Sequence, residues 1–189
     1  MARGRRPTDV VREEIVQAAG DLLFEVGMNG FTIEAVAARS GASKMTIYKL
    51  WPSKGALALE GYFTRVEPSL RFPDTGQIEA DLRTQLLAFV SLLRDSPAGQ
   101  VIAELIGRAQ LDPALKDAFL GTYSGPRRAL AVETLERARA RGQVRADLDA
   151  EAVVDQLWGA CYHRWLLPNQ PLTDDFAVEL IRNLFRGVT

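Results

Sequence analysis

Residues 41–54 read GASKMTIYKLWPSK, a stretch that reaches Pro52 after barely two helical turns. Ser43 can cap a helix at its start, and proline cannot continue one. With Ile47 set as the buried position and about 100° added per residue, Leu50 and Trp51 stay near the inside. The outside then carries Met45, Thr46, Tyr48 and Lys49. The stretch therefore predicts a short helix with one buried side and one exposed side that is rich in hydrogen-bond donors.

Two further helices are expected before this stretch. Thr32 can cap a helix over residues 33–40, and Gly41 can turn the chain immediately afterwards. Apolar residues recur at helical spacing over residues 11–26, and Gly27 follows where helices commonly end. Two short helices joined by a glycine turn form a helix-turn-helix, whose second helix can lie in the DNA major groove.

The rest of the chain predicts helices and no strand alternation. Helix starts are expected at Ser53, Pro97, Asp112, Thr173 and at Asp147 or Asp149. The pair Gly125-Pro126 is expected to break or kink a helix, and Gly142 to end one. We expect an all-α fold of about nine or ten helices. Residues 1–54 would be the helix-turn-helix domain with a basic N-terminal arm, and residues 55–189 a helical ligand-binding and dimerisation domain.

Composition excludes several classes of protein. Hydrophobic residues make up 47% and charged residues 25% of the chain, and no apolar run is long enough to cross a bilayer. The basic N-terminus leads into a charged segment rather than an apolar one, unlike a secretory signal, so we expect a cytoplasmic protein without a membrane partner. A single cysteine, Cys161, allows neither an internal disulfide nor a thiolate metal site.

Charge is distributed unevenly. The formal net charge of −1 alone argues against nucleic-acid binding, but basic residues outnumber acidic ones over residues 1–54 and the reverse holds afterwards. Lys54 begins a helix, where a cation and free backbone N–H groups together suit a phosphate. An N-terminal arm could enter the minor groove through Arg3, Arg5 and Arg6.

The exposed side of the short helix suits a DNA duplex. Lys44 and Lys49 can reach phosphates or base acceptors, and the Thr46 hydroxyl can donate to either. Met45 can touch a thymine methyl group. A single lysine on such a helix is more often only solvated, so the prediction depends on the whole set.

The stretch from Ile15 to Leu57, IVQAAGDLLFEVGMNGFTIEAVAARSGASKMTIYKLWPSKGAL, resembles the DNA-binding domain of the TetR family of transcriptional regulators. The matching residues are Ile15, Ala18, Ala19, Gly27, Thr32, Val36, Ala37, Gly41, Ser43, Thr46, Ile47, Tyr48, Pro52, Ser53 and Lys54. The resemblance implies a homodimer that binds double-stranded operator DNA. It implies phosphate contacts from Thr32, Tyr48 and Lys54. It implies base-reading positions at Lys44, Met45, Thr46 and Lys49, and Ser43 is a further candidate contact.

Two residues depart from the family pattern. Met45 stands where a glycine, a proline or another small residue is usual, which leaves the base preference open. Trp51 replaces the commoner phenylalanine, which we interpret as a conservative replacement in the core. Residues 68–189 resemble the ligand-binding and dimerisation region of the family more loosely, through helix count and ERARARGQVRADLDAEAVVDQLWGACYHRWLL. Fold analogy does not identify the effector.

An effector pocket between helices would be lined by apolar residues with a few polar groups. The candidates are Tyr62, Phe63, Phe89, Leu93, Ile102, Leu105, Ile106, Phe119, Tyr123, Trp158 and Tyr162. Each of them is more often an ordinary core residue. The three tyrosines stand slightly apart because a buried hydroxyl needs a hydrogen-bond partner.

The last two helices, expected over residues 149–167 and 173–188, have broad hydrophobic faces. Paired across a two-fold axis, they would form a four-helix dimer interface. The candidate contacts are Gly159, Ala160, His163, Trp165, Leu180 and Leu184. In the alternative interpretation, these faces only complete the core of the monomer. A dimer is favoured because it places two reading helices about one DNA turn, near 34 Å, apart.

No pattern of residues indicates an enzyme. Cys161 and His163 point about 200° apart on a helix, so they cannot act as nucleophile and base. We expect no catalytic residue, no metal ligand and no cofactor. The predicted function is a repressor that binds a palindromic operator as a dimer and is released by a small-molecule effector. The alternative is an all-α small-molecule-binding protein with no DNA-dependent role, which would lack salt-sensitive duplex binding.

Overall fold

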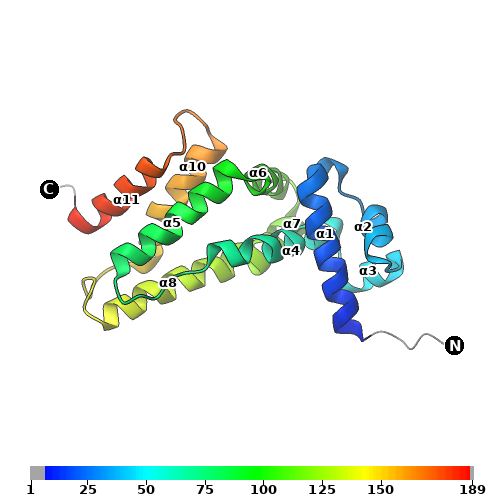
Figure 1. Cartoon of the computed structure of the whole chain (residues 1–189), viewed down its shortest axis with the longest axis horizontal. Coiled ribbons are helices and arrows are strands. Elements are labelled where there is room, and N and C mark those ends of the chain that lie inside the picture. The colour runs from blue at the N-terminus through cyan, green and yellow to red at the C-terminus, as the bar shows by residue number, and fades with distance from the viewer. Residues whose placement is uncertain (1–6, 188–189) are drawn as a thin grey trace. The chain divides into compact units, whose positions relative to one another are not determined.

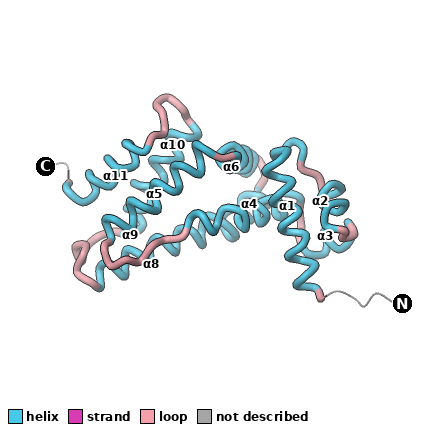
Figure 2. Tube along the Cα trace, in the orientation of Figure 1, coloured by secondary structure: helices cyan, strands magenta, loops and turns pink. Residues whose placement is uncertain are grey.

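Helices account for the regular secondary structure of residues 7–187, the part of the chain that the computed structural model describes (Figures 1 and 2). The helices are α1 (Thr8–Gly30), α2 (Ile33–Ser40), α3 (Lys44–Leu50), α4 (Lys54–Val66), α5 (Ile78–Asp95), α6 (Pro97–Ala109), α7 (Pro113–Ala118), α8 (Gly125–Ala140), α9 (Ala150–Val154), α10 (Ala160–Leu166) and α11 (Asp174–Arg186). A 3-10 turn, η1 (Glu67–Leu70), and two π-helical turns, η2 (Phe119–Ser124) and η3 (Asp155–Gly159), complete them. Counting each π turn with the helices that it joins leaves nine helices in these residues. The predicted all-α fold is confirmed.

The chain forms two compact units. Unit 1 holds the described residues up to Val66 together with Gln100–Tyr123. Unit 2 holds Glu67–Gly99 and the described residues from Ser124 onward. Unit 1 therefore contains α4, α7 and most of α6 as well as the first three helices. A domain boundary between residues 54 and 55 stays a prediction.

The short helices of unit 1 begin and end at the residues that the sequence indicates. The Thr32 hydroxyl accepts a hydrogen bond from Ala35 N (3.1 Å) at the start of α2, and Gly41 ends that helix with φ 68°. Ser43 Oγ accepts from Thr46 N (3.1 Å) at the start of α3. These side chains satisfy backbone donors that a helix start otherwise leaves free.

Helix α1 breaks at Gly27, whose φ of 63° and ψ of −178° are not helical. The N–H of Met28, which the break frees, donates to Glu104 Oε2 on α6 at 2.9 Å. Arg108, one turn later on α6, donates to Asn29 Oδ1 at 2.7 Å. Residues of α6 thus hold the turn between α1 and α2, a contact that the local sequence does not indicate.

Helices α1 and α4 meet backbone to backbone. A Cβ added to Gly61 would lie 2.7 Å from Gly20 N, and one added to Gly20 would lie 2.8 Å from Gly61 O. Both glycines are buried, and fully buried Ile15, Leu23 and Leu57 belong to the same two helices. This close contact anchors α4, which follows α3 in the chain.

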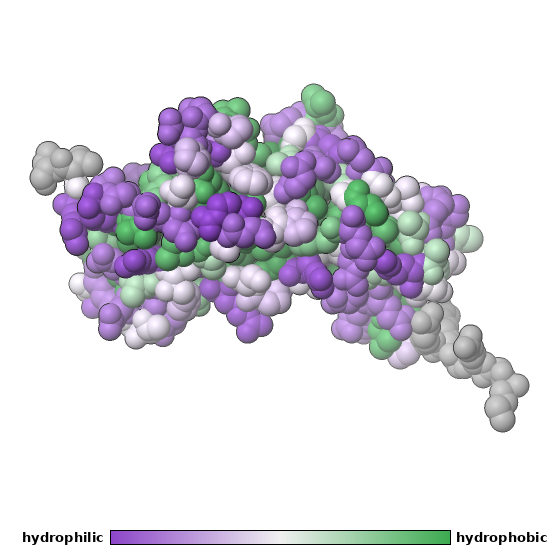
Figure 3. All heavy atoms as spheres, turned by 45° about the horizontal axis from the view of Figure 1, so that its top comes forward, coloured by the Kyte–Doolittle hydropathy of each residue, from purple (hydrophilic) through white to green (hydrophobic). Residues whose placement is uncertain are grey.

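Unit 2 is a helical bundle in which α11 packs against α5 and η3, and α8 against α5 and α9. Its core includes Leu82, Leu86 and Leu93, which are fully buried on α5. As expected, Asp149 caps α9 and Thr173 caps α11 with their side-chain oxygens. No helix among residues 7–187 is both long and apolar enough to span a membrane. The face of the protein seen in Figure 3 is mostly hydrophilic, with hydrophobic residues in separate patches.

The structure differs from the sequence prediction at Gly125-Pro126. The chain stays helical through this pair, and the change in geometry falls earlier, over the π-helical residues of η2. Proline fits the first turn of α8 because its missing N–H is not needed there. The π turn changes the helical register just before it, which relieves the clash that a proline causes inside an α-helix.

Candidate nucleic-acid interface

Helix α3 has a buried side and an exposed side. Ile47 is fully buried, and Trp51, the residue after the helix, is 4% exposed. On the opposite side, Met45 is 83% and Tyr48 is 57% exposed, and Lys49 is exposed as well. The predicted orientation of the helix is confirmed, and its exposed side chains can reach a partner without unfolding.

Two hydroxyl groups at the start of α3 are hydrogen-bonded to each other. Ser43 Oγ and Thr46 Oγ1 lie 2.9 Å apart, and Ser43 Oγ also accepts the Thr46 backbone N–H. A hydroxyl can donate once and accept twice, so capacity remains for a phosphate or base atom. Both side chains are predicted DNA contacts, and their mutual hydrogen bond fixes their positions.

Lys44 is paired with an acid in the free protein. Its Nζ donates to Glu34 Oε1 on α2 at 3.0 Å, and both side chains are more than half exposed. The hydrogen bond and the opposite charge raise the pKa of Lys44 and lower the pKa of Glu34. Glu34 was not predicted as a partner, because ten positions separate it from Lys44. If Lys44 contacts a DNA phosphate as predicted, that phosphate must compete with this carboxylate.

Lys54 and Thr32, two predicted phosphate contacts, come from adjoining points of unit 1. Lys54 Nζ donates to the carbonyl oxygen of Phe31 at 3.2 Å, and Phe31 directly precedes Thr32. The start of α4 is thereby tied to the start of α2. The predicted arm residues Arg3, Arg5 and Arg6 lie outside the described residues.

Two family models match most of the chain. Residues 15–60 match the family described as "Bacterial regulatory proteins, tetR family", and residues 72–184 match "Tetracyclin repressor-like, C-terminal domain". The chain belongs to the TetR family. It is thus a helix-turn-helix transcriptional regulator and not an enzyme.

Two bacterial relatives support this membership over most of the chain. The uncharacterised HTH-type transcriptional regulator YdeS of Bacillus subtilis is 34% identical over 98% of this chain and 93% of its own length. The DNA-binding transcriptional repressor TetR of Mycobacteroides abscessus is 30% identical over 88% and 87%, respectively.

Solved structures share the fold. The TetR family transcription regulator SCO0332 superposes with a TM-score of 0.91 at 52% identity, covering 95% of this chain and 98% of that one. FadR of Bacillus subtilis, solved in complex with stearoyl-CoA, superposes with a TM-score of 0.62 at 16% identity, covering 94% and 99%. The FadR likeness shows the TetR fold alone.

The predicted effector contacts fall into both units. In unit 1, the rings of Tyr62, Phe63 and Phe119 each lie 5.5–6.0 Å from the ring of Tyr123. Burial raises the pKa of Tyr62 well above its ordinary value. The other candidates of unit 1 are buried Ile102 and Leu105 and half-buried Ile106 on α6.

In unit 2, α5 and the η3–α10 segment bring a second set together. The rings of Phe89 and Tyr162 lie 5.2 Å apart, and Trp158 lies 5.7 Å from Phe72. Leu93 is fully buried on α5. Phe72 was not among the predicted residues, since it lies in a loop without a periodic pattern.

Gln85 is one of three buried polar side chains among the described residues of unit 2 that were not predicted, beside Asp81 and Thr134. Gln85 on α5 is 1% exposed, and its Oε1 accepts from Trp158 Nε1 at 2.9 Å. The Trp158 donor fixes the orientation of the amide, which leaves Gln85 Nε2 buried without a hydrogen-bond partner. A signal was visible, because Gln85 interrupts the apolar stripe between Leu82 and Phe89.

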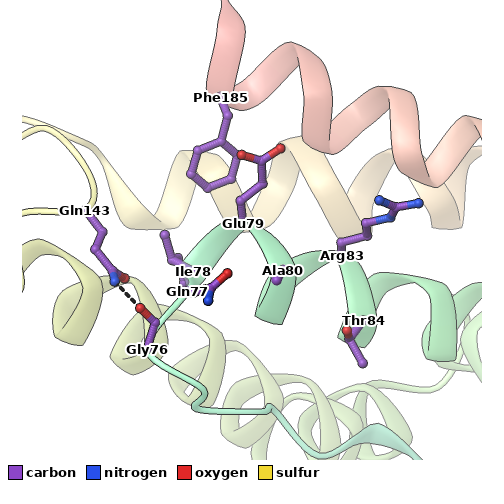
Figure 4. A pocket seen from close by; sticks show the side chains of 9 residues that line it. All are labelled: Gly76, Gln77, Ile78, Glu79, Ala80, Arg83, Thr84, Gln143 and Phe185. Atoms are coloured by element: carbon purple, nitrogen blue, oxygen red, sulfur yellow. Dashed lines mark hydrogen bonds between the residues drawn. The ribbon is translucent and has the colours of Figure 1, made fainter.

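A groove of about 750 Å³ lies at the start of α5 (Figure 4). Its lining mixes apolar residues with polar ones, among them Arg83, Thr84 and Gln143, whose amide donates to Gly76 O. Glu79 of α5 and Phe185 of α11 also line it. None of the predicted effector contacts lines this groove, and we assign it no role.

The predicted dimer contacts lie at the surface of unit 2. Gly159 and His163 are exposed, and the remaining four, Ala160, Trp165, Leu180 and Leu184, are half-buried. Trp165 also donates its indole N–H to Gly99 O at 2.9 Å within the same chain. Leu167, at the end of α10, is 60% exposed. These contacts remain predictions.

The thiol of Cys161 is buried. Burial raises its pKa to about 12, so it stays protonated at neutral pH. Among residues 7–187, no group of three or more His, Cys, Asp or Glu side chains could hold a metal ion.

Proposed function

We propose that this TetR-family regulator is a homodimeric repressor that binds a palindromic operator through α3 and is released by a small-molecule effector. The exposed side of α3 carries the proposal. A methionine, a tyrosine and two lysines project from a helix that Ser43 caps and Ile47 anchors. Such a set can combine phosphate contacts with base contacts in a major groove.

A dimer follows from the size of the reading element. One helix of seven residues, Lys44–Leu50, reaches few base pairs. Two copies related by a two-fold axis double the contacts and require a palindrome with half-sites about one DNA turn apart. The exposed positions of α10 and the half-buried apolar flank of α11 supply the surface that we assign to the second copy.

Release by an effector requires a ligand that favours a conformation with misplaced reading helices. The coupling free energy between effector binding and operator binding must reach on the order of 1–3 kcal/mol to change the occupancy of the operator several-fold. The aromatic groups of unit 2 and the unpaired Nε2 of Gln85 offer an apolar lining with a polar donor. In FadR, the same fold accommodates stearoyl-CoA. We infer a cytoplasmic protein, since DNA is its target.

Selection of bound duplexes tests the function. The purified protein is incubated with fragments of the source genome, and bound fragments are sequenced and measured again at 50 and 200 mM salt. We expect a palindromic sequence and a fall in affinity of roughly 10³-fold if about six phosphates are contacted. Recovery of random fragments would contradict operator binding. It would favour a helical protein that only binds small molecules. Such a protein would not require the exposed side chains of α3.

A further inference from the structure

Trp51 anchors the end of the reading helix. It directly follows α3, its backbone N–H donates to Ile47 O at 2.9 Å, and its side chain is buried. Within α3 itself only Ile47 is buried. The direction of this short helix therefore depends strongly on how Trp51 is held.

The indole of Trp51 has a polar partner on α4. Its Nε1 donates to Glu60 Oε2 at 2.8 Å. The same carboxylate receives Arg12 of α1 at two points, Nη2 to Oε2 at 2.8 Å and Nη1 to Oε1 at 2.6 Å. The Glu60 side chain is only 19% exposed, and a two-point guanidinium contact fixes its rotamer.

Arg12 closes the contact by touching Trp51 as well. Its guanidinium carbon lies 5.3 Å from the centre of the indole ring, within the range of a cation–π interaction. Each of the three side chains thus contacts the other two. We call this set the Arg12–Glu60–Trp51 cluster, and it joins α1 and α4 to the end of α3.

Because α3 is short, a small displacement at Trp51 changes the direction of the whole helix. Seven residues span only about 10.5 Å, so a displacement of about 1 Å at Trp51 tilts the helix by roughly 5°. Hydrogen bonds to base edges tolerate a spread of only about 0.5 Å. A hydrogen bond from Lys49, near that end of α3, to a base would leave this range of distances. Phosphate contacts tolerate larger shifts and would persist.

We propose that Glu60 is a positioning residue for DNA recognition, which holds Trp51 and Arg12 so that α3 meets the operator in one orientation. The inference builds on the proposed function, and it concerns specificity rather than folding. It also revises the interpretation of Trp51. The indole is not simply a larger phenylalanine, because phenylalanine at this position could not donate to Glu60.

Four variants test the role of the cluster. Trp51→Phe keeps an aromatic ring and removes the donor, Glu60→Ala removes the acceptor, and Glu60→Gln keeps an oxygen for the indole. Asp21→Asn is the matched control, because Asp21 pairs with Arg65 between α1 and α4 at 3.3 Å without touching α3. All are compared below their melting temperatures, on the operator selected by the wild type and on a scrambled duplex.

We expect Trp51→Phe and Glu60→Ala to weaken operator binding roughly ten-fold while scrambled-duplex binding stays within about two-fold. Glu60→Gln should lie between Glu60→Ala and the wild type, and Asp21→Asn should match the wild type. Operator affinity within two-fold of wild type for Glu60→Ala would overturn the proposal, even if that variant melts at a lower temperature. An equal loss in Asp21→Asn would overturn it too.

Hydrogen exchange without DNA separates this inference from the proposed function. Amides of residues 43–52 should exchange several-fold faster in Glu60→Ala than in wild type or Asp21→Asn, with residues 33–40 unchanged. Unchanged exchange in residues 43–52 would overturn the positioning role even where DNA binding is normal. If the wild type selects no duplex although the exchange responds as expected, the proposed function fails and the anchoring of α3 stands.

Discussion

The ion pair between Lys44 and Glu34 opposes phosphate binding at α3, because Lys44 must leave Glu34 to contact a phosphate. Glu34 neutralises Lys44 and places a negative charge beside the predicted DNA contacts of α3. Glu34→Gln should therefore tighten binding to a scrambled duplex. The slope of log K against log salt should become steeper by about 0.9 if one more phosphate is engaged.

A change of net charge in unit 2 controls for this effect. Glu179→Gln removes the same negative charge from α11, where Glu179 pairs with Arg182. A salt slope that responds equally to both substitutions would contradict a specific role for Glu34.

Tyr48 and Lys54 are expected to contact phosphates rather than bases. Tyr48→Phe and Lys54→Ala should each weaken operator and scrambled duplex alike, by about ten-fold for a lost hydrogen bond to a charged group. Titrations on both duplexes measure this. A loss confined to the operator would show that the residue reads sequence instead.

Residue identities predicted the caps of α2 and α3 well, because Thr32 and Ser43 act on backbone groups three positions away. The contacts of Lys44 and Trp51 could not be predicted in this way. Their acidic partners lie ten and nine positions away, beyond intervening turns, so proximity depends on how the helices pack.

At the scale of elements, the contact between α1 and α4 depends on two small residues. Gly61→Ala would place a methyl group 2.7 Å from Gly20 N, so the backbones must separate. We expect a loss of about 1–3 kcal/mol in the free energy of unfolding despite the better helix propensity of alanine. Denaturant unfolding monitored by circular dichroism measures it.

Gly107 is the matched control, because a Cβ there meets nothing within 4 Å in α6. Gly107→Ala should be neutral or stabilise by up to about 1 kcal/mol. Equal stability of the two variants would contradict the close packing of α1 on α4.

Element starts and ends were largely predictable, since Asp112, Asp149 and Thr173 cap helices as their sequence positions indicate. The π turns η2 and η3 were not. Gly125-Pro126 was expected to break or kink a helix, whereas the chain stays helical through the pair and a π turn lies just before it.

For the whole molecule, dimerisation is the feature that operator binding most requires. Gly159 is exposed and an added Cβ meets nothing within 4 Å in the chain, so Gly159→Arg should leave the monomer folded. In the assigned interface, the arginine would separate two copies. We expect sedimentation equilibrium to show monomers and operator affinity to fall about 100-fold or more.

Gly121→Arg provides the comparison, because Gly121 also lies exposed in a π turn with open space around it. It should remain dimeric. A dimeric Gly159→Arg variant with normal operator affinity would place the interface elsewhere.

The all-α class and the family could be predicted because the pattern of capped helices and a glycine turn in residues 15–57 is specific to the DNA-binding domain of the TetR family. The effector site could not, because Tyr62 and Trp158 look like equal candidates in the sequence yet belong to different units. Which apolar faces meet, and that Gln85 receives a hydrogen bond from Trp158, depends on packing between helices distant in the chain.

The most direct measurement is a repeated selection of genome fragments with the wild type and with Met45→Ala and Lys49→Ala variants. If the exposed side of α3 reads DNA, each variant should select a sequence altered at the same positions of both half-sites. An unchanged selected sequence, with affinity lowered equally for all fragments, would contradict base reading by α3.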